Sequence, residues 1–203
     1  MDLKLKFDEN GLIPAIVQNY KTGKVLMLGY MNQEAFDKTV ETNRVWFYSR
    51  SRQCLWLKGE TSNNFLDVMK IDIDCDSDAL LVKANPQGPT CHTGNETCFY
   101  TEVKQNEDYF DSTIIYDLYD VIKGRKENPI EGSYTNYLLD KGIDKILKKV
   151  GEENAETIIA AKNNDKDEIV YETSDLLYHL LVMLFDRGVE PELIMQSLCK
   201  RRK

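Results

Sequence analysis

The polar stretch Glu102-Val103-Lys104-Gln105-Asn106-Glu107-Asp108 marks a change in hydrophobic pattern, and it decides the fold. It offers few apolar anchors, as expected of a connection between domains. Before it, short β-rich runs alternate with turn signals, whereas after it apolar residues recur with helical periodicity. The sequence therefore predicts two domains: a β-rich α+β domain over residues 1–105 and an all-α domain over residues 106–203.

Each half predicts its own set of elements. One helix, Gln33–Thr42, and six strands are expected in the N-terminal half, the strands at 15–17, 25–30, 45–48, 55–58, 65–73 and 79–84. Three helices are expected in the C-terminal half, over 114–123, 137–161 and 167–187. Gly188 and Pro191 are typical of the end of a helix, so the last one should stop at Arg187.

The overall composition excludes several classes of protein. With 42% hydrophobic and 30% charged residues, the chain of 203 residues has enough apolar material for a globular core, which argues against disordered or collagen-like proteins. Thirty-four acidic against 26 basic residues give a net charge of −8, which disfavours non-specific binding to nucleic acid. The longest apolar stretch, Leu176–Phe185, is far shorter than the roughly 20 residues of a membrane span.

The N-terminus and the cysteines bear on the cellular compartment. The first residues lack the apolar region of a secretory signal, so we expect a cytoplasmic protein, whose thiols are kept reduced. Five cysteines then suggest metal binding or chemistry rather than disulfides.

A strictly alternating segment, Ile71-Asp72-Ile73-Asp74-Cys75-Asp76-Ser77-Asp78, suggests a first cation site. In an extended strand Asp74, Asp76 and Asp78 would share one face, and Cys75 would point to the other. Three carboxylates on one face repel one another unless a cation compensates them, and oxygen ligands favour magnesium. A solvated acidic edge strand is an equally good interpretation of this pattern taken alone.

The thiols suggest a second kind of metal. Cys91 and Cys98 lie on a glycine-containing loop, and Cys75 could supply a third sulfur ligand. Three protein ligands leave one position open at zinc, which lowers the pKa of a bound water to about 7. His92 could accept a proton from that water. The alternative is a set of buried reduced thiols.

Carboxylates also recur at helical spacing in the C-terminal half. Glu152 and Glu153 each lie one turn from Glu156, and Glu172 and Asp175 form an i, i+3 pair. Like charges one turn apart cost only about 0.2 to 0.5 kcal/mol, so a solvated face remains possible. The second pair adjoins the apolar run 176–185, however, and acids at the edge of a buried helix need a counter-cation. Magnesium carrying a polyphosphate substrate fits this pattern.

Residues 10–100 resemble phosphoribosyl-AMP cyclohydrolases. The motifs that carry the resemblance are Met31-Asn32-Gln33-Glu34-Ala35, Ser49-Arg50-Ser51-Arg52, Leu55-Trp56-Leu57-Lys58-Gly59-Glu60-Thr61-Ser62, Asp74-Cys75-Asp76-Ser77-Asp78 and Gly88-Pro89-Thr90-Cys91-His92-Thr93-Gly94. The resemblance implies zinc on Cys75, Cys91 and Cys98, with Cys75 donated across a dimer interface, and magnesium on the three aspartates.

Two further points concern this half. Arg50, Arg52 and Lys58 could hold phosphate, although an exposed basic face explains each of them equally well. Asn63 stands where a glycine is expected after Thr61-Ser62, which puts the conformation of that turn in doubt.

Residues 110–203 resemble phosphoribosyl-ATP pyrophosphohydrolases, all-helical relatives of the MazG-type nucleotide pyrophosphatases. The motifs are Gly132-Ser133-Tyr134-Thr135, the run 145–156 ending in Gly151-Glu152-Glu153-Asn154-Ala155-Glu156, and Glu172-Thr173-Ser174-Asp175-Leu176-Leu177-Tyr178-His179. The implied catalytic and magnesium-binding pattern is Glu-Glu-x-x-Glu followed by Glu-x-x-Asp. Lys145, Lys148 and Lys149 could reach the phosphates or form a solvated face. We expect His179 to be a packing residue with one hydrogen bond.

The two resemblances together imply a bifunctional enzyme of histidine biosynthesis. The C-terminal domain would cleave phosphoribosyl-ATP between its α and β phosphates, and the N-terminal domain would open the purine ring of phosphoribosyl-AMP by water attack at C6. A homodimer is expected, because two helices alone cannot bury residues 176–185 well. The alternatives are a house-cleaning nucleotide pyrophosphatase fused to a non-catalytic zinc module, and a metal-dependent interaction protein.

Overall fold

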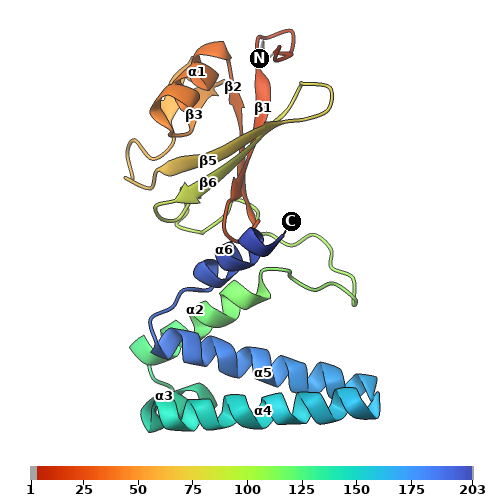
Figure 1. Ribbon diagram of the computed structural model, residues 1–203. Helices are drawn as coiled ribbons and strands as arrows, with labels where there is room; N and C mark the ends of the chain where they lie inside the picture. The colour runs from red at the N-terminus through yellow and green to blue at the C-terminus, as the bar shows by residue number, and fades with distance from the viewer. Residues whose placement is uncertain (1–3, 203) are drawn as a thin grey trace. The chain divides into compact units, whose positions relative to one another are not determined.

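The computed structural model describes residues 4–202 and divides the chain into two compact units, with the boundary between Phe110 and Asp111. The N-terminal unit contains all the strands of the described chain and one helix, and the C-terminal unit is built from helices alone (Figure 1). The predicted fold class, a β-rich domain followed by an all-α domain, is confirmed.

A four-stranded sheet forms the centre of the N-terminal unit. Its order is β2 (Val25–Met31), β1 (Ile13–Asn19), β6 (Leu80–Pro86) and β5 (Leu66–Ile73). The strand β1 pairs antiparallel with β2 and parallel with β6, and β5 pairs antiparallel with β6. Alternate residues of β1 are buried, as the twofold period of a strand with one core face requires.

A hairpin and one helix complete the N-terminal core. The strands β3 (Trp46–Ser49) and β4 (Cys54–Leu57) pair antiparallel, and α1 spans Gln33–Thr42, the predicted range. Asn32 caps α1 by accepting a hydrogen bond from the Ala35 amide. A Cβ atom at Gly29 would lie 2.3 Å from the Phe47 ring, so only glycine allows β2 and β3 to pack this closely.

The prediction of an extended segment over residues 71–78 is wrong beyond Ile73. The strand β5 ends there, and the chain turns back towards β6. Asp74 is the cause, because its Oδ1 accepts hydrogen bonds from the amides of Asp78 (2.9 Å) and Ala79 (3.0 Å). A short aspartate side chain that satisfies backbone N–H groups favours a turn over a strand.

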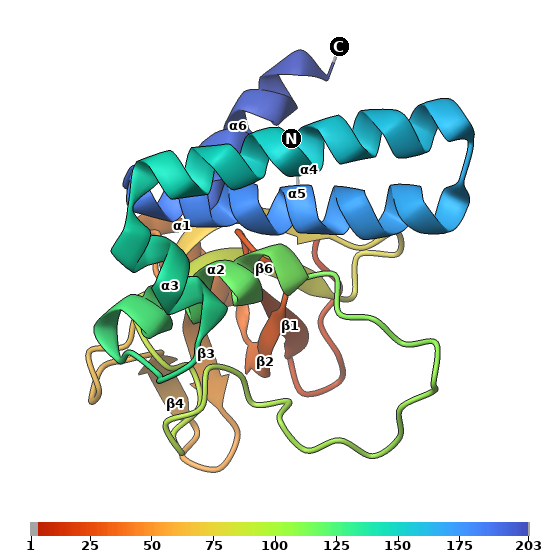
Figure 2. The ribbon, with the colours of Figure 1, turned by 90° about the horizontal axis from the view of Figure 1, so that it is seen from below.

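The C-terminal unit contains the helices α2 (Ile114–Glu127), α3 (Tyr134–Lys141), α4 (Ile143–Asn163), α5 (Lys166–Asp186) and α6 (Pro191–Arg201). The helices α4 and α5 lie side by side along their whole length (Figures 1 and 2). Their core includes Ile122, Leu138, Ile146 and Val182, all completely buried. None of the helices in residues 4–202 is both long and apolar enough to cross a membrane.

Two expectations for the helices need correction, and one helix was not expected. The single helix over 137–161 is wrong, because Gly142 adopts a φ of 77° and separates α3 from α4. The helix α6 was not predicted at all. The run 176–185 is not buried all round within one chain, since Leu177 stays 47% exposed while Leu181 and Val182 are buried. By contrast, α5 ends as predicted, with Arg187 as its cap and Gly188 at a positive φ of 67°.

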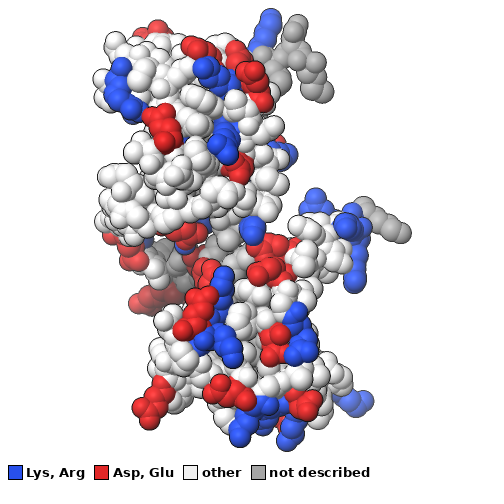
Figure 3. Space-filling view, turned by 90° about the vertical axis from the view of Figure 1, so that its left-hand side faces the viewer, with Lys and Arg blue, Asp and Glu red and all other residues white. Residues whose placement is uncertain are grey.

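Charges are mixed on the face of the molecule that Figure 3 shows. On the face shown in Figure 3, acidic and basic side chains lie next to one another in both units rather than forming one large area of a single sign.

Candidate active sites

The first candidate site is a loop that follows β6 and is held from both sides. The amides of Thr90 and Cys91 donate to the carbonyls of Glu96 (3.2 Å) and Asn95 (3.0 Å), which closes the loop on itself. On its other side, the Asn64 side-chain amide donates to the Pro89 carbonyl at 3.1 Å. The backbone around the predicted ligand Cys91 is therefore fixed by hydrogen bonds.

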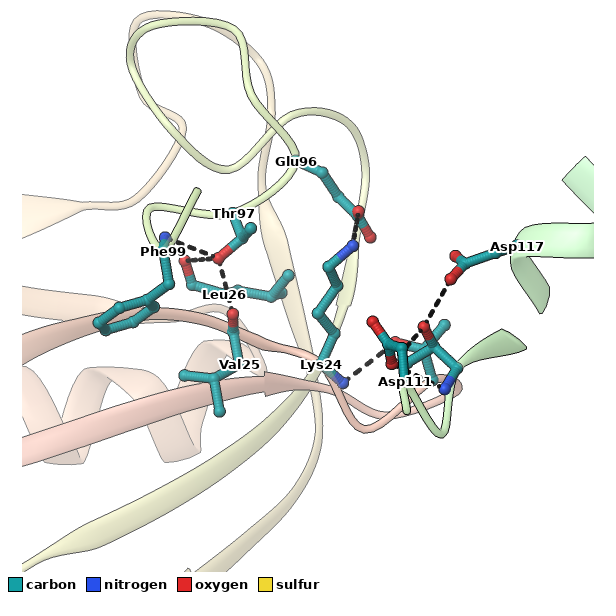
Figure 4. Close-up of polar contacts among 10 residues, drawn as sticks. Lys24, Val25, Leu26, Glu96, Thr97, Phe99, Asp111 and Asp117 are labelled. Atoms are coloured by element: carbon teal, nitrogen blue, oxygen red, sulfur yellow. Dashed lines mark hydrogen bonds and ion pairs between the residues drawn. The ribbon is translucent and has the colours of Figure 1, made fainter. Parts of the chain in front are cut away.

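The far end of this loop is anchored to β2 (Figure 4). The buried Thr97 hydroxyl donates to the Val25 carbonyl at 2.7 Å and accepts from the Phe99 amide at 3.0 Å. Next to it, the Cys98 amide donates to the Leu26 carbonyl at 2.8 Å, and Lys24 pairs with Glu96 at 2.8 Å. The role of Thr97 could not be predicted from the sequence, because the Val25 carbonyl that it contacts lies more than 70 residues away along the chain.

The two thiols of the loop open on a cavity of about 520 Å³, which is large enough for a nucleotide. The Thr93 hydroxyl donates to the Cys91 sulfur at 3.1 Å, and this contact lowers the pKa of the Cys91 thiol. Loss of solvation, together with the neighbouring Cys91, raises the pKa of Cys98. Cys91 is therefore the more readily ionised of the two thiols, and the thiolate is the form that binds metal.

Two buried polar groups line the same cavity. Lys58 is only 7% exposed, and burial lowers its pKa, although the nearby thiols of Cys98 and Cys91 oppose that effect. Thr90 is 2% exposed, and its hydroxyl oxygen has no hydrogen-bond partner within residues 4–202. His92 also lines the cavity, is exposed, and has its Nδ1 3.9 Å from the Cys91 sulfur.

The two predicted arginines occupy different places. The Arg52 guanidinium lies 5.9 Å from the Trp56 ring centroid and 3.9 Å from Glu60, and both neighbours line the 520 Å³ cavity. Arg50 instead stacks on the Tyr30 ring at 3.9 Å and lines a separate cavity of about 450 Å³ with Asp8. The structure brings Lys58, but not Arg50, to the thiols.

The aspartates gather, although not on a strand. Asp74, Asp76 and Asp78 are exposed, and one oxygen of each lies within 4.8 Å of the others. The turn therefore brings the three carboxylates together, as one face of the expected strand would have done. Cys75 is exposed in the same turn, and within residues 4–202 no three-ligand group combines it with Cys91 and Cys98.

Asn63 resolves the doubt about the turn after Thr61 and Ser62. It adopts a left-handed φ of 60°, a conformation that asparagine tolerates better than most residues. The turn therefore keeps the backbone that a glycine would favour.

The second candidate site lies between α4 and α5. Glu153 and Glu156 project from α4 and Glu172 from α5, and one oxygen of each lies within 4.8 Å of the others. Glu153 is only 3% exposed. Loss of solvation, and then repulsion from Glu156 and Glu153, raises the pKa of Glu172, as expected for acids held together without a cation. These groups could hold a metal ion.

Lysine side chains compensate part of this charge. The Lys149 ammonium lies 2.5 Å from Glu153 and 3.2 Å from Glu152, and these contacts raise its pKa. Glu152 also pairs with Lys148 at 3.2 Å, and the two lysines lower its pKa. Lys145 lies over the Tyr137 ring, 5.9 Å from its centroid. Glu152 therefore faces lysines, whereas its neighbour Glu153 faces the acids as well.

Asp175 and the buried His179 belong to a hydrogen-bond network beside these acids. The Asp175 side chain is not part of the three-acid group, and its backbone carbonyl accepts from His179 Nδ1 at 2.8 Å. With Nδ1 donating to that carbonyl, Nε2 can accept a hydrogen bond from the Tyr134 hydroxyl, 3.0 Å away. His179 thus packs with two hydrogen bonds rather than the one expected. The sequence had shown Tyr134 only as part of a motif.

Comparisons with known proteins match a different family model in each half of the chain. Residues 27–100 match the family model of phosphoribosyl-AMP cyclohydrolase, and residues 115–202 match that of phosphoribosyl-ATP pyrophosphohydrolase. The histidine biosynthesis bifunctional protein HisIE of Caldanaerobacter subterraneus subsp. tengcongensis is 57% identical over 100% of this chain and 99% of its own length. The chain belongs to the family of bifunctional histidine biosynthesis proteins.

Other members of the family are similar over their full length. The bifunctional protein of Bacillus subtilis is 52% identical over 98% of this chain and 95% of its own, and that of Thermus thermophilus is 45% identical over 100% and 95%. These matches confirm the expectation of an enzyme with a cyclohydrolase and a pyrophosphohydrolase domain, acting on small molecules of histidine biosynthesis.

Proposed function

We propose that the C-terminal unit cleaves phosphoribosyl-ATP between its α and β phosphates with the help of magnesium, and that the N-terminal unit then opens the purine ring of phosphoribosyl-AMP with the help of zinc. The observation that carries this proposal is the separation of two donor sets. Thiols line a nucleotide-sized cavity in one unit, and carboxylates converge between two helices in the other. In this proposal the border between the catalytic domains stays near residue 105, the position expected from the sequence, whereas the compact units meet at Phe110 and Asp111.

The cyclohydrolase site fits zinc by the chemistry of its donors. Cys91 and Cys98 are soft ligands on a fixed loop, and Cys75 is the third ligand in this proposal. Because Cys75 is exposed and outside any three-ligand group with them in one chain, it would come from the second subunit of a homodimer. Zinc with three protein ligands lowers the pKa of a bound water.

The chain's own residues supply the remaining functions of this site. His92 lies at the cavity and accepts a proton from the water that attacks C6. Lys58 offers an ammonium group from a buried stem, and Arg52 lies at the edge, so both suit substrate phosphate. Arg50 serves the same purpose in our proposal, although it lines a separate cavity.

The pyrophosphohydrolase site fits magnesium. Carboxylates from Glu153, Glu156 and Glu172 are hard oxygen ligands within one ion's reach, and Asp175, one turn beyond Glu172, completes the set. Bound magnesium neutralises the charge that develops on a polyphosphate during cleavage. Lys149, already beside Glu153, is the lysine best placed to contact a phosphate oxygen, with Lys145 and Lys148 on the same helix and Glu152 holding the lysines in place.

Two further assignments complete the proposal. The exposed aspartates Asp74, Asp76 and Asp78 hold a second magnesium ion in the N-terminal unit. The enzyme acts in the cytoplasm, where thiols remain reduced and available to zinc.

Selective removal of zinc tests the separation of the two activities. We expect a zinc chelator to abolish ring opening of phosphoribosyl-AMP while pyrophosphate release from phosphoribosyl-ATP continues in excess magnesium, with both rates measured on the same preparation. Restoring zinc should restore ring opening. Simultaneous loss of both activities would contradict two separate sites, and cleavage of ordinary nucleoside triphosphates but not phosphoribosyl-ATP would favour a house-cleaning pyrophosphatase.

A further inference from the structure

The sulfur of Cys91 receives a hydrogen bond from its own loop. The Thr93 hydroxyl donates to Cys91 Sγ at 3.1 Å, whereas the Nδ1 atom of the intervening His92 is 3.9 Å from the same sulfur. Cys91 lines the cavity of about 520 Å³, but Thr93 does not. The hydroxyl therefore contacts the sulfur without taking up the space that a nucleotide would occupy.

The side chain of Asn95 determines where the proton of this hydroxyl points. A threonine hydroxyl carries a single proton, so it can donate only one hydrogen bond. The Asn95 amide nitrogen donates to Thr93 Oγ1 at 2.9 Å, which leaves the threonine proton for the Cys91 sulfur. The two hydrogen bonds run in one direction, from Asn95 through Thr93 to Cys91, and hydrogen bonds in series strengthen one another.

The backbone of the loop holds these three side chains together. The Cys91 amide donates to the Asn95 carbonyl at 3.0 Å, and the Gly94 amide donates to the Cys91 carbonyl at 3.1 Å. The first of these bonds joins the two ends of the hydrogen-bond chain. Thr93 and Asn95 are exposed, so water alone could satisfy their polar groups. The loop instead turns both of them towards the sulfur.

A hydrogen bond to the sulfur of a metal ligand has two physical effects. It fixes the direction in which the ligand points, and it draws electron density away from the sulfur. A sulfur that gives up less electron density leaves its metal ion more electrophilic, which is the property that activation of water requires.

We propose that Thr93 is a positioning residue of the cyclohydrolase site. Its hydroxyl holds the Cys91 sulfur in the orientation that receives zinc and lowers the electron density on that sulfur, while Asn95 directs the Thr93 proton to it. This inference rests on the proposed zinc site.

The decisive variant is Thr93→Val, which keeps the shape of the side chain and removes the hydroxyl. The Kd for zinc, measured on the metal-free full chain by competition with a chromophoric chelator, should rise about tenfold or more, as is typical when a partner of a metal ligand is lost. Thr93→Ser keeps a hydroxyl and should restore the affinity of the parent. The exposed Thr101 supplies the control Thr101→Val, which should bind zinc normally.

Cobalt(II) in place of zinc provides a readout that a purely structural role would not move. The sulfur-to-cobalt charge-transfer band should shift to longer wavelength in Thr93→Val, because a sulfur without the hydrogen bond gives up an electron more easily. The band of Thr93→Ser should coincide with that of the parent. Weaker zinc binding with an unshifted band would mean that Thr93 only shapes the loop, and would overturn the proposal.

A double-mutant cycle tests the part assigned to Asn95. Asn95→Ala keeps the backbone carbonyl that binds the Cys91 amide, and should weaken zinc binding less than Thr93→Val does. In the Thr93→Val background the same change should have no further effect, since Asn95 acts only through the threonine hydroxyl. Additive effects of the two changes would overturn that part of the proposal.

Two remaining outcomes separate this inference from the proposed function. If the parent binds zinc and opens the ring, but Thr93→Val binds zinc as tightly as the parent, Thr93 is not a positioning residue. If the parent itself binds no zinc or does not open the ring of phosphoribosyl-AMP, the proposed function fails, and the role of Thr93 fails with it.

Discussion

The two candidate sites are assembled over very different distances along the chain. The acids between α4 and α5 come from consecutive helices joined by two residues, and three of them converge within a single chain. The thiol site draws on a loop anchored to β2, more than 70 residues away, and Cys75 stays apart from it. The comparison teaches that helical periodicity can bring several possible ligands together locally, whereas the loop site depends on tertiary structure and, in our proposal, on a second chain.

The largest effect is expected from Glu153→Gln. This change keeps the shape of a side chain that is 3% exposed but removes the charge that faces both Lys149 and the other acids. Pyrophosphate release should fall by about 100-fold or more, since an essential ligand is weakened, while ring opening is unchanged. Both rates are measured on the same purified protein.

Glu127→Gln is the matched control for this variant. Glu127 is an exposed acid of α2 in the same unit. The Glu127→Gln variant should leave both activities unaltered. Full pyrophosphohydrolase activity in Glu153→Gln would contradict the assignment of the acids between α4 and α5 as the pyrophosphohydrolase site.

A mixture of two inactive variants tests whether the loop site needs a second chain. Cys75→Ser and Cys91→Ser should each lose zinc and ring opening when they form homodimers, while pyrophosphate release persists. In a mixed dimer, the chain with intact Cys91 and Cys98 receives Cys75 from its partner. Unfolding and refolding the variants together should therefore restore about a quarter of the normal zinc content and activity, because half of randomly formed dimers are mixed and each holds one complete site.

Cys54→Ser provides the control, because Cys54 is exposed and lies outside the ligand motifs. Its zinc content should be normal. If the refolded mixture remains free of zinc and inactive, Cys75 does not act across an interface.

The same contrast explains how much the sequence could predict. The helix α1 and the end of α5 follow from caps and local spacing, so their bounds were predicted within a residue. Gly142 and Asp74 broke the expected helix and strand, because a positive φ and a side chain that accepts two backbone hydrogen bonds override periodicity. The role of Thr97 depends on partners that are visible only once the chain is folded.

A moderate effect on stability is expected from Thr97→Val. The change removes a hydroxyl that donates to β2 and accepts from Phe99, so the N-terminal unit should lose about 1 to 2 kcal/mol. The two tryptophans, Trp46 and Trp56, both lie in that unit, and their fluorescence reports its unfolding. Helical circular dichroism, to which the C-terminal unit contributes most, should show no shift in the unfolding of that unit.

The exposed Thr101 supplies the control Thr101→Val. Equal stability of the Thr97 and Thr101 variants would show that the anchor to β2 contributes nothing.

The smallest effect is a response to acid that differs in sign between the units. The raised pKa of Glu172, caused by loss of solvation and by repulsion from the neighbouring acids, means that this carboxyl binds more protons in the folded than in the unfolded state. The metal-free helical unit should therefore gain stability as the pH falls from neutral towards the unfolded value of 4.5. Asp8 in the N-terminal unit acts in the opposite direction. A hydrogen bond from the Leu12 amide lowers its pKa below 3.8, so its contribution to stability is kept at pH 5 and is lost only as the pH falls below about that value.

Denaturation of the metal-free full chain at pH 7 and pH 5 measures this difference. The midpoint seen by helical circular dichroism should rise at pH 5, and Glu172→Gln should abolish that part of the rise, because the amide does not titrate. Tryptophan fluorescence of an Asp8→Asn variant should show the same loss of stability relative to the parent at both pH values, since Asp8 stays ionised at each. An unchanged pH response in Glu172→Gln would mean that the acids between α4 and α5 do not repel one another enough to raise the pKa of Glu172. The reason to expect a cation between these helices would then be weaker.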